Sequence, residues 1–364
     1  MGALEEWIAE MFLVHSLNLL RFSADVQGKI ISLMGAMSME LAGKLGEGDV
    51  SSYGKQRLAA LLRESNAVIS SHYSGMEAEA MRNLLGMTRI EADYTAKVLT
   101  QGLKIELGAK LPPATYLEKL VGDTLIKGAS SANWWKRQVL DTQFRFASQV
   151  RLGAAQGETT SQIVARVVGT SGRAAGSDVE AIPGILKSSE AYARALVHSS
   201  VQAVANAARL ASFQQNADLI ECLVWLSTLD SHTCLLCAMR DLHEYSLDDQ
   251  EPINHTYEWA SGPGAIHFSC RCVLSMRTKS FKDLGIELDE PGESTRPSDG
   301  GPVSSKMNLK DFLASKDKAW RAEYLGPGRA EMYEAGKITM NDLMNLKGRK
   351  LTLSELQKKY SFKD

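Results

Sequence analysis

The residues of this chain whose types and spacing best suit chemistry lie between positions 234 and 272. The string CLLC supplies Cys234 and Cys237, and the string HFSCRC supplies His267, Cys270 and Cys272. A C-x-x-C pair followed about 30 residues later by a second group of Cys and His has the spacing of a structural zinc site. This cluster therefore predicts a bound metal ion.

The predicted ligands are Cys234, Cys237, His267 and Cys270. In each half of this set, two ligands are separated by two other residues, which suits a tight turn around one tetrahedral ion. Cys272 is the alternative to Cys270, because residues two apart on an extended chain share a face, and the sequence leaves this choice open. Four protein ligands leave no position for water, so the predicted zinc is structural. The competing interpretation is that reduced cysteines pack as small apolar side chains.

The composition is that of an ordinary globular chain. It has 364 residues, of which 44% are hydrophobic and 23% charged, with a formal net charge of −2. Such a balance excludes a basic field over the whole chain that would favour nucleic acid. Glu5 and Glu6 stand where a secretion signal would be basic, and no run approaches the roughly 20 apolar residues of a membrane span. Five unevenly placed cysteines favour a reducing compartment over a disulfide framework.

Helical spacing dominates residues 1–217, where apolar side chains recur every three or four positions. An apolar helix is predicted to open with Leu13, Leu17, Leu20 and Phe22. The further predicted helical segments are 23–46, 51–85, 87–109, 114–127, 131–155, 158–169 and 187–216. Breaks are predicted at Gly46 to Gly48 and at Pro112-Pro113, and Ser51-Ser52 are predicted to cap the following helix. Residues 170–184 are predicted to be a loop, because they are rich in Gly, Ser and Ala.

The pattern then changes to short strands. Residues 219–229 and 273–277 are rich in β-branched and other apolar residues, and they flank the Cys/His cluster. The predicted fold is mainly α, with a multi-helical N-terminal body, a small α+β zinc-knuckle module and a helical C-terminal tail. The predicted division is a helical domain at 1–186, the zinc-knuckle domain at 187–288, a linker at 289–305 and a helical module at 306–364.

Other aromatic and histidine residues have simpler predicted roles. Trp134 and Trp135 are predicted to be core or interface residues, because large aromatics commonly dominate packing. His15, His243 and His255 are predicted to be solvated side chains rather than ligands.

The cluster and its flanking residues resemble a known family. LSTLDSHTCLLCAMRDLHEY (226–245) followed by GPGAIHFSCRC (262–272) is similar to the phage head morphogenesis family, the Mu F-like minor capsid proteins. The corresponding residues are Trp225, Asp230, Thr233, Cys234, Cys237, Leu242, His267, Cys270, Arg271 and Cys272. The segment Ala205 to Arg209 and the C-terminal tail also resemble the family, over about residues 187–360. His232 and Phe268 depart from it, since the family usually has arginine and proline there.

The resemblance implies a structural minor virion protein of a tailed phage rather than an enzyme. It implies association with the portal or the major capsid protein, and a role in capsid assembly, DNA packaging or DNA delivery. A homo-oligomer, a virion location, and the host cytoplasm during assembly fit the same expectation.

Two alternatives remain open from the residues. A DNA-binding or ejected internal protein is suggested by the basic tail, where Lys347, Arg349, Lys350, Lys358 and Lys359 could meet phosphates. The simpler interpretation of that tail is a solvated basic face.

A zinc hydrolase or nuclease is the less favoured alternative. It would use acidic residues near the cluster, namely Asp230, Asp241, Glu244 and Glu258, together with His255. The chain lacks the H-E-x-x-H pattern of zinc proteases, and acidic residues in polar loops are usually solvated.

Overall fold

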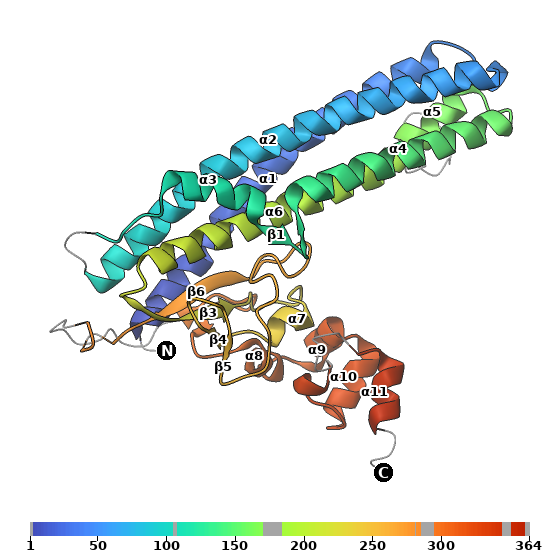
Figure 1. The fold of residues 1–364 in the computed structure, drawn as a ribbon. Helices are drawn as coiled ribbons and strands as arrows, with labels where there is room; N and C mark the ends of the chain where they lie inside the picture. The colour runs from blue at the N-terminus through green and yellow to red at the C-terminus, as the bar shows by residue number, and fades with distance from the viewer. Residues whose placement is uncertain are drawn as a thin grey trace. The chain divides into compact units, whose positions relative to one another are not determined.

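The computed structural model describes residues 3–104, 108–169, 184–280, 282–284, 295–343 and 351–360. Helices make up most of these residues, and the strands within them form three small sheets. The predicted mainly α class is therefore confirmed (Figure 1). The predicted loop at 170–184 lies almost wholly outside the described residues.

The α-helices are α1 (Ala3–Gly46), α2 (Lys55–Leu103), α3 (Ala114–Asp123), α4 (Ser131–Ala155), α5 (Thr160–Val168), α6 (Ile185–Gln215), α7 (Leu235–Ala238), α8 (Leu309–Ser315), α9 (Lys318–Leu325), α10 (Pro327–Glu334) and α11 (Leu353–Tyr360). Two 3-10 turns are η1 (Val50–Ser52) and η2 (Met340–Leu343). The strands are β1 (Leu125–Ile126), β2 (Ala129–Ser130), β3 (Ile220–Leu226), β4 (Glu244–Tyr245), β5 (Pro252–Ile253), β6 (Val273–Thr278), β7 (Thr295–Arg296) and β8 (Val303–Ser304).

The chain divides into two compact units that interleave along the sequence. Unit 1 comprises Met1–Leu19, Thr88–Leu120 and Gln202–Asp364, and unit 2 comprises Leu20–Met87 and Val121–Val201. The boundaries fall inside α1, α2, α3 and α6. The sequence-based division cuts the chain into consecutive segments, whereas each compact unit combines segments that are separate in the sequence. The sequence-based domain boundaries therefore stay a prediction.

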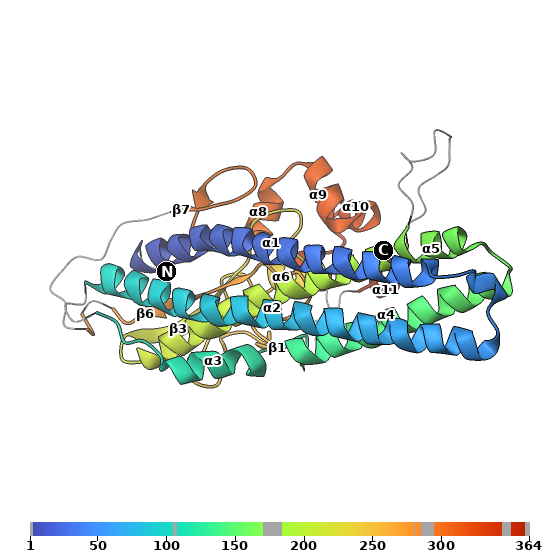
Figure 2. The same ribbon diagram turned by 90° about the horizontal axis from the view of Figure 1, so that it is seen from above.

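Unit 2 is built mainly from helical segments, with the short β1–β2 hairpin between α3 and α4. Within it, α1 and α2 run side by side in opposite directions, as Figures 1 and 2 both show. Thr142 of α4 joins two neighbours through its hydroxyl, which lies 2.9 Å from the Tyr73 hydroxyl and 3.0 Å from that of Ser189. Trp135 is fully buried and meets Tyr73 edge to face, which confirms its predicted core role.

Several predicted helix ends in this part of the chain are wrong. The helix predicted to open with Leu13 begins already at Ala3 and continues as α1, and α2 runs through Gly86 without a break. A Cβ at Gly86 would meet nothing within 4 Å, so this glycine costs only about 1 kcal/mol of helix propensity in a long helix. Ser51 and Ser52 form η1, capped by the Asp49 side chain, instead of capping α2. The break after Gly46 and the capped helix α5 are confirmed.

Unit 1 contains a four-stranded antiparallel sheet in the order β5-β4-β3-β6. The two predicted strands correspond to β3 and β6 and lie side by side, with Trp225 opposite Leu274. Every β3 residue except Glu221 is buried, which explains the continuous apolar run in its sequence. Phe12 of α1 and Phe213 of α6 pack in the same core, with ring centroids 5.8 Å apart.

A buried ion pair ties helices to this sheet inside unit 1. Arg209 of α6 pairs with Glu91 of α2, and both side chains are only 1% exposed. Arg209 also donates to the carbonyl of Leu274 on β6, at 3.0 Å. His15 contacts the second oxygen of Glu91 at 2.8 Å, so the prediction of a solvated His15 is wrong. Burial would raise the pKa of Glu91, but the charges of Arg209 and His15 hold it below its usual value.

The C-terminal segment belongs to unit 1 and packs on its metal-site region. Residues 295–304 form the β7–β8 hairpin, and Arg296 is buried, so the linker prediction is wrong for these residues. Residues 289–294 lie outside the described part of the chain. The described part of the predicted helical tail contains α8 to α11. Phe312 and Leu325 of this tail pack in one apolar cluster with Leu235 and Met239.

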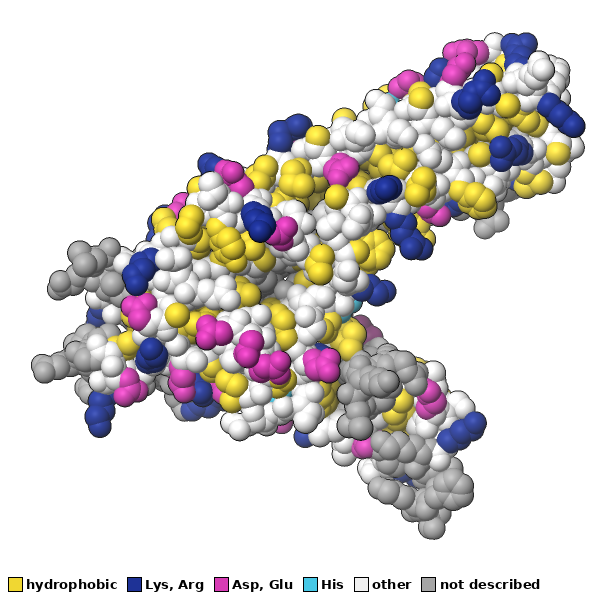
Figure 3. Space-filling model, in the orientation of Figure 1, with side chains coloured by type: hydrophobic (Ala, Val, Ile, Leu, Met, Phe, Trp, Pro, Cys, Tyr) yellow, Lys and Arg dark blue, Asp and Glu magenta, His cyan; other side chains and the backbone are white. Residues whose placement is uncertain are grey.

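The surface carries both signs of charge. On the face shown in Figure 3, Lys and Arg side chains are interspersed with Asp and Glu. None of the helices that the structure describes is long and apolar enough to cross a membrane.

Candidate metal centre

The structure brings all five predicted candidates together in unit 1. Two groups of possible ligands share Cys237: one adds Cys234 and His267, and the other adds Cys270 and Cys272. Within each group the ligand atoms lie within 4.8 Å of one another. The described residues of this cluster could therefore hold a metal ion.

Three of the distances between donor atoms are close to, and shorter than, the edges of a tetrahedral zinc site. With bonds of about 2.3 Å to sulfur and about 2.0 Å to nitrogen, the edges of a zinc site are about 3.8 Å between sulfurs and about 3.5 Å between sulfur and nitrogen. The Sγ atoms of Cys237 and Cys270 lie 3.6 Å apart. The Nε2 atom of His267 lies 3.0 Å from the Cys234 sulfur and 3.2 Å from that of Cys237. Small outward shifts would thus accommodate the ion.

Local backbone geometry presents the ligands. Cys234 is the N-cap of the single-turn helix α7, which places Cys237 on the same side one turn later. In the second half, the Cys270 amide donates to the carbonyl of His267 at 3.3 Å, and Ser269 has a φ of +59°. This left-handed residue closes the turn that brings His267 and Cys270 to one point.

The imidazole is oriented for metal binding. The Nδ1 atom of His267 lies 2.8 Å from the carbonyl of Phe268, so Nδ1 carries the hydrogen that is donated there. That bond leaves Nε2 facing the cysteine sulfurs. Metal-bound histidines commonly have such a partner for their second ring nitrogen.

The cysteine and histidine side chains of the cluster shift one another's pKa values. Hydrogen bonds from Cys237 and His267 lower the pKa of Cys234 to about 5, and bonds from Cys237 and Cys272 lower that of Cys270. Hydrogen bonds to Cys234 and Cys270 raise the pKa of His267 to about 11. The cluster therefore favours thiolates at Cys234 and Cys270 with a protonated His267. A metal ion would replace that proton and would meet the same negative charge.

The two candidates for the fourth ligand have different surroundings. Cys270 interacts with both Cys237 and His267, which belong to the first group of ligands. Cys272 is fully buried, which raises the pKa of its thiol, and its sulfur lies 3.5 Å from the Ser227 hydroxyl. Both cysteines group with Cys237, so the choice of Cys270 as the fourth ligand stays a prediction.

Other residues of the sequence motif hold the two halves of the site together. Arg271 makes a two-pronged salt bridge to Asp230, with both N···O distances 2.7 Å. Although burial opposes it, this contact holds the pKa of Asp230 below its usual value. The Thr233 hydroxyl donates to the carbonyl of Thr228 at 2.6 Å. These contacts fix the loop before Cys234 against the C-R-C segment.

Helix α6 positions β6 through a residue that sequence reasoning passed over. The Asn206 side chain accepts from the Leu274 amide at 2.7 Å and donates to the Cys272 carbonyl at 3.2 Å. Gly264, with a φ of +80°, approaches so closely that a Cβ there would lie 2.6 Å from Asn206 Nδ2. The only signal in the sequence was the resemblance of the segment Ala205 to Arg209 to the family helix.

The acidic residues considered for catalysis are mostly engaged elsewhere. Asp230 pairs with Arg271, Asp241 with Arg296 and Glu244 with Arg277, whereas Glu258 is exposed.

The nearby histidines are not solvated as predicted. His255 lies 2.7 Å from the Glu244 carbonyl through Nε2 and accepts from the Tyr257 amide through Nδ1. Burial lowers its pKa. Its ring packs edge to face on His243, with centroids 4.4 Å apart, so both act as packing groups.

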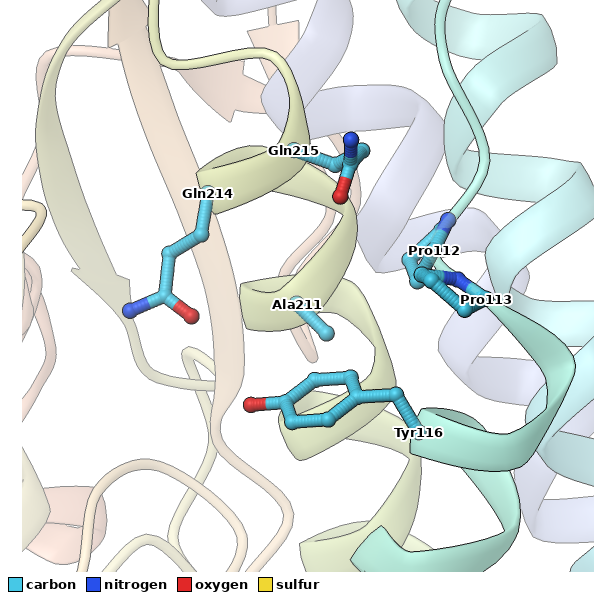
Figure 4. A pocket seen from close by; sticks show the side chains of 6 residues that line it. All are labelled: Pro112, Pro113, Tyr116, Ala211, Gln214 and Gln215. Atoms are coloured by element: carbon cyan, nitrogen blue, oxygen red, sulfur yellow. The ribbon is translucent and has the colours of Figure 1, made fainter.

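A hollow of about 340 Å³ lies elsewhere in unit 1 (Figure 4). Its lining residues are Pro112, Pro113, Tyr116, Ala211, Gln214 and Gln215. No cysteine, histidine or carboxylate lines it, so it offers neither a metal ligand nor a strong acid or base.

The predicted DNA contacts fall mainly outside the described residues. Lys347, Arg349 and Lys350 lie there, as does the side chain of Lys359. Lys358 is exposed on α11.

Comparison with known proteins adds no family assignment. No family model, no curated protein and no solved structure matches this chain.

Proposed function

We propose that this protein is a structural assembly component of a tailed-phage head, of the Mu F-like head morphogenesis class. The proposed ion is zinc, bound by Cys234, Cys237, His267 and Cys270 as a closed site that stabilises unit 1. The observation that carries the proposal is that the residues of the motif, scattered over 226–272, meet at one site. Its ligands and its Asp230–Arg271 clamp coincide with the residues that carry the resemblance.

A structural role accounts for the chemistry better than catalysis does. Four protein ligands leave a zinc ion no position for water, and hydrolysis at zinc requires such a position. Three of the acidic residues near the site are paired with arginine. The protein would act through its surfaces, by binding the portal or the major capsid protein inside the assembling virion.

The test combines metal analysis with particle assembly. Purified protein should contain one zinc per chain, and protein produced with phage portal and capsid proteins should be found in particles by mass spectrometry. Cys237→Ser should lose the zinc and enter particles poorly, whereas the control Cys222→Ala, with its sulfur outside the cluster, should retain both. Full incorporation of a zinc-free Cys237→Ser protein would contradict the structural role of the metal.

A further inference from the structure

We infer that Asp241 is a positioning residue that couples the metal site to the docking of the C-terminal helices, defined here as α8 to α10 and η2 (Leu309–Leu343). Metal binding and docking of these helices would then stabilise each other. The inference rests on the proposed metal site, and all the residues that it uses belong to unit 1.

The helix that carries two ligands also carries part of the docking surface. α7 has only four residues. It contains Cys237, and Cys234 is its N-cap residue. Its Leu235 and Ala238 pack with Phe312 and Leu313 of α8 in one apolar cluster. A helix this short is unstable alone and takes its conformation from its contacts. Loss of the metal would therefore loosen the surface on which α8 packs.

Asp241, three residues after α7, connects this surface to α8 directly. One carboxylate oxygen accepts from the Leu309 amide at 2.8 Å, which satisfies a free N–H group in the first turn of α8. The other accepts from the Ser227 amide at 2.8 Å. Arg296 bridges both oxygens, each at 3.1 Å, and the Asp241 side chain is 0% exposed.

Ser227 joins this network to the sulfur cluster. Its hydroxyl donates to the Cys237 carbonyl at 2.8 Å and lies 3.5 Å from the Cys272 sulfur. Its amide donates to Asp241, and its carbonyl accepts from Arg296. A shift of the Cys237 backbone on metal loss would thus displace Ser227 and, through it, Asp241 and Arg296. The path from metal to helix is made of buried hydrogen bonds, which tolerate little displacement.

Linkage makes the inference quantitative. If metal and docking are coupled, the factor by which undocking weakens metal binding equals the factor by which metal removal weakens docking. Residues that orient metal ligands typically contribute about 10-fold to 100-fold to metal affinity. We expect both factors in that range.

The first measurement uses the unaltered full-length chain. Hydrogen exchange of the zinc-loaded and the chelated protein is compared over 309–343, with 189–200 of unit 2 as the internal reference. Chelation should raise exchange about 10-fold to 100-fold in 309–343 and leave 189–200 unchanged. Equal protection of 309–343 in both states would overturn the inference.

The second measurement uses variants and the affinity for Zn²⁺, determined by competition with a chelator. Asp241→Asn and Phe312→Ala should each weaken binding about 10-fold to 100-fold, and Phe312→Ala should match the exchange factor. The control Asp248→Asn changes an exposed carboxylate and should bind as the unaltered protein does. Co²⁺ bound in place of zinc should show an altered visible spectrum in Asp241→Asn, which a role confined to folding stability would not produce.

The two proposals fail in different ways. If the unaltered protein binds no zinc, both the metal site and the coupling are overturned. If it binds zinc but Phe312→Ala binds it equally well, only the coupling is overturned. Phe312→Ala lies outside the polar network, so it decides the question even where Asp241→Asn fails to fold.

Discussion

Unit 2 and unit 1 bury polar side chains of different kinds. Among the described residues of unit 2, the buried polar side chains are all serine or threonine, as in the Tyr73–Thr142–Ser189 contacts. In unit 1 they include Glu91, Arg209, Asp241 and Arg296 as well as the thiols of the candidate metal centre. A buried hydroxyl needs one partner, whereas a buried charge is costly unless it is fully paired.

The difference follows from the lengths of the elements. Unit 2 consists mainly of long helical segments, whose backbone groups are satisfied internally and whose apolar faces pack regularly. The metal-site region of unit 1 contains α7 with four residues and β4 with two, which cannot bury enough apolar area alone. Ligands and ion pairs replace that area. Unit 1 should thus respond strongly to metal, charge and pH, while unit 2 should respond mainly to packing.

The largest effect should come from removing the metal. Zinc binding contributes on the order of 10 kcal/mol to folding in small zinc-finger peptides. Chelation, or Cys237→Ser, should lower the melting temperature and open unit 1 in hydrogen exchange while α4 of unit 2 keeps its protection. Cys222→Ala is the control, because Cys222 is buried in β3 outside the cluster. Equal loss of protection in both units would remove the contrast between them.

The next effect should come from breaking the buried ion pair of unit 1. Glu91→Gln leaves Arg209 buried without its counter-charge, which typically costs about 3 to 5 kcal/mol. The matched control is Glu190→Gln in unit 2, whose partner Arg194 is 46% exposed, and such pairs are worth about 1 kcal/mol or less. Urea unfolding of the two variants measures both values. Similar losses would show that burial does not distinguish the two pairs.

Acidification should reveal the same pair with a smaller effect. The pKa of Glu91 is lowered in the folded protein, so its contribution is present above the unfolded value of about 4.5 and is lost as the pH falls through the folded pKa. The stability difference between the unaltered protein and Glu91→Gln should therefore shrink below about pH 4.5. Thermal unfolding from pH 7 to pH 3 measures it. A difference that stays constant over this range would contradict the pairing.

Some features of the two units could be predicted from local signals in the sequence, and others could not. Local signals sufficed for most of the helical segments, for β3 and β6, and for the meeting of the five Cys and His candidates. They failed at Gly86, because one glycine costs a long helix only about 1 kcal/mol, and at Ser51, because the Asp49 side chain caps η1 there.

Long-range pairing was out of reach for the sequence. Arg296 lies in a segment whose Gly, Ser and Pro content is typical of a linker, yet it is buried against Asp241. Nothing local in the sequence relates residue 296 to residue 241. The same holds for Glu91 and Arg209, which meet only because α2 and α6 pack in unit 1.

The smallest effect tests the uncharged contacts of unit 2. Thr142→Val keeps the shape of the side chain but leaves the hydroxyls of Tyr73 and Ser189 without this partner, at a cost of about 1 to 2 kcal/mol. Ser161→Ala, at an exposed position of α5, should change stability by less than about 0.5 kcal/mol. Because no charge or ligand is involved, the Thr142→Val loss should be the same with and without zinc and between pH 5 and pH 8. A loss that grows on chelation would show that the metal's influence extends to the serine and threonine core of unit 2.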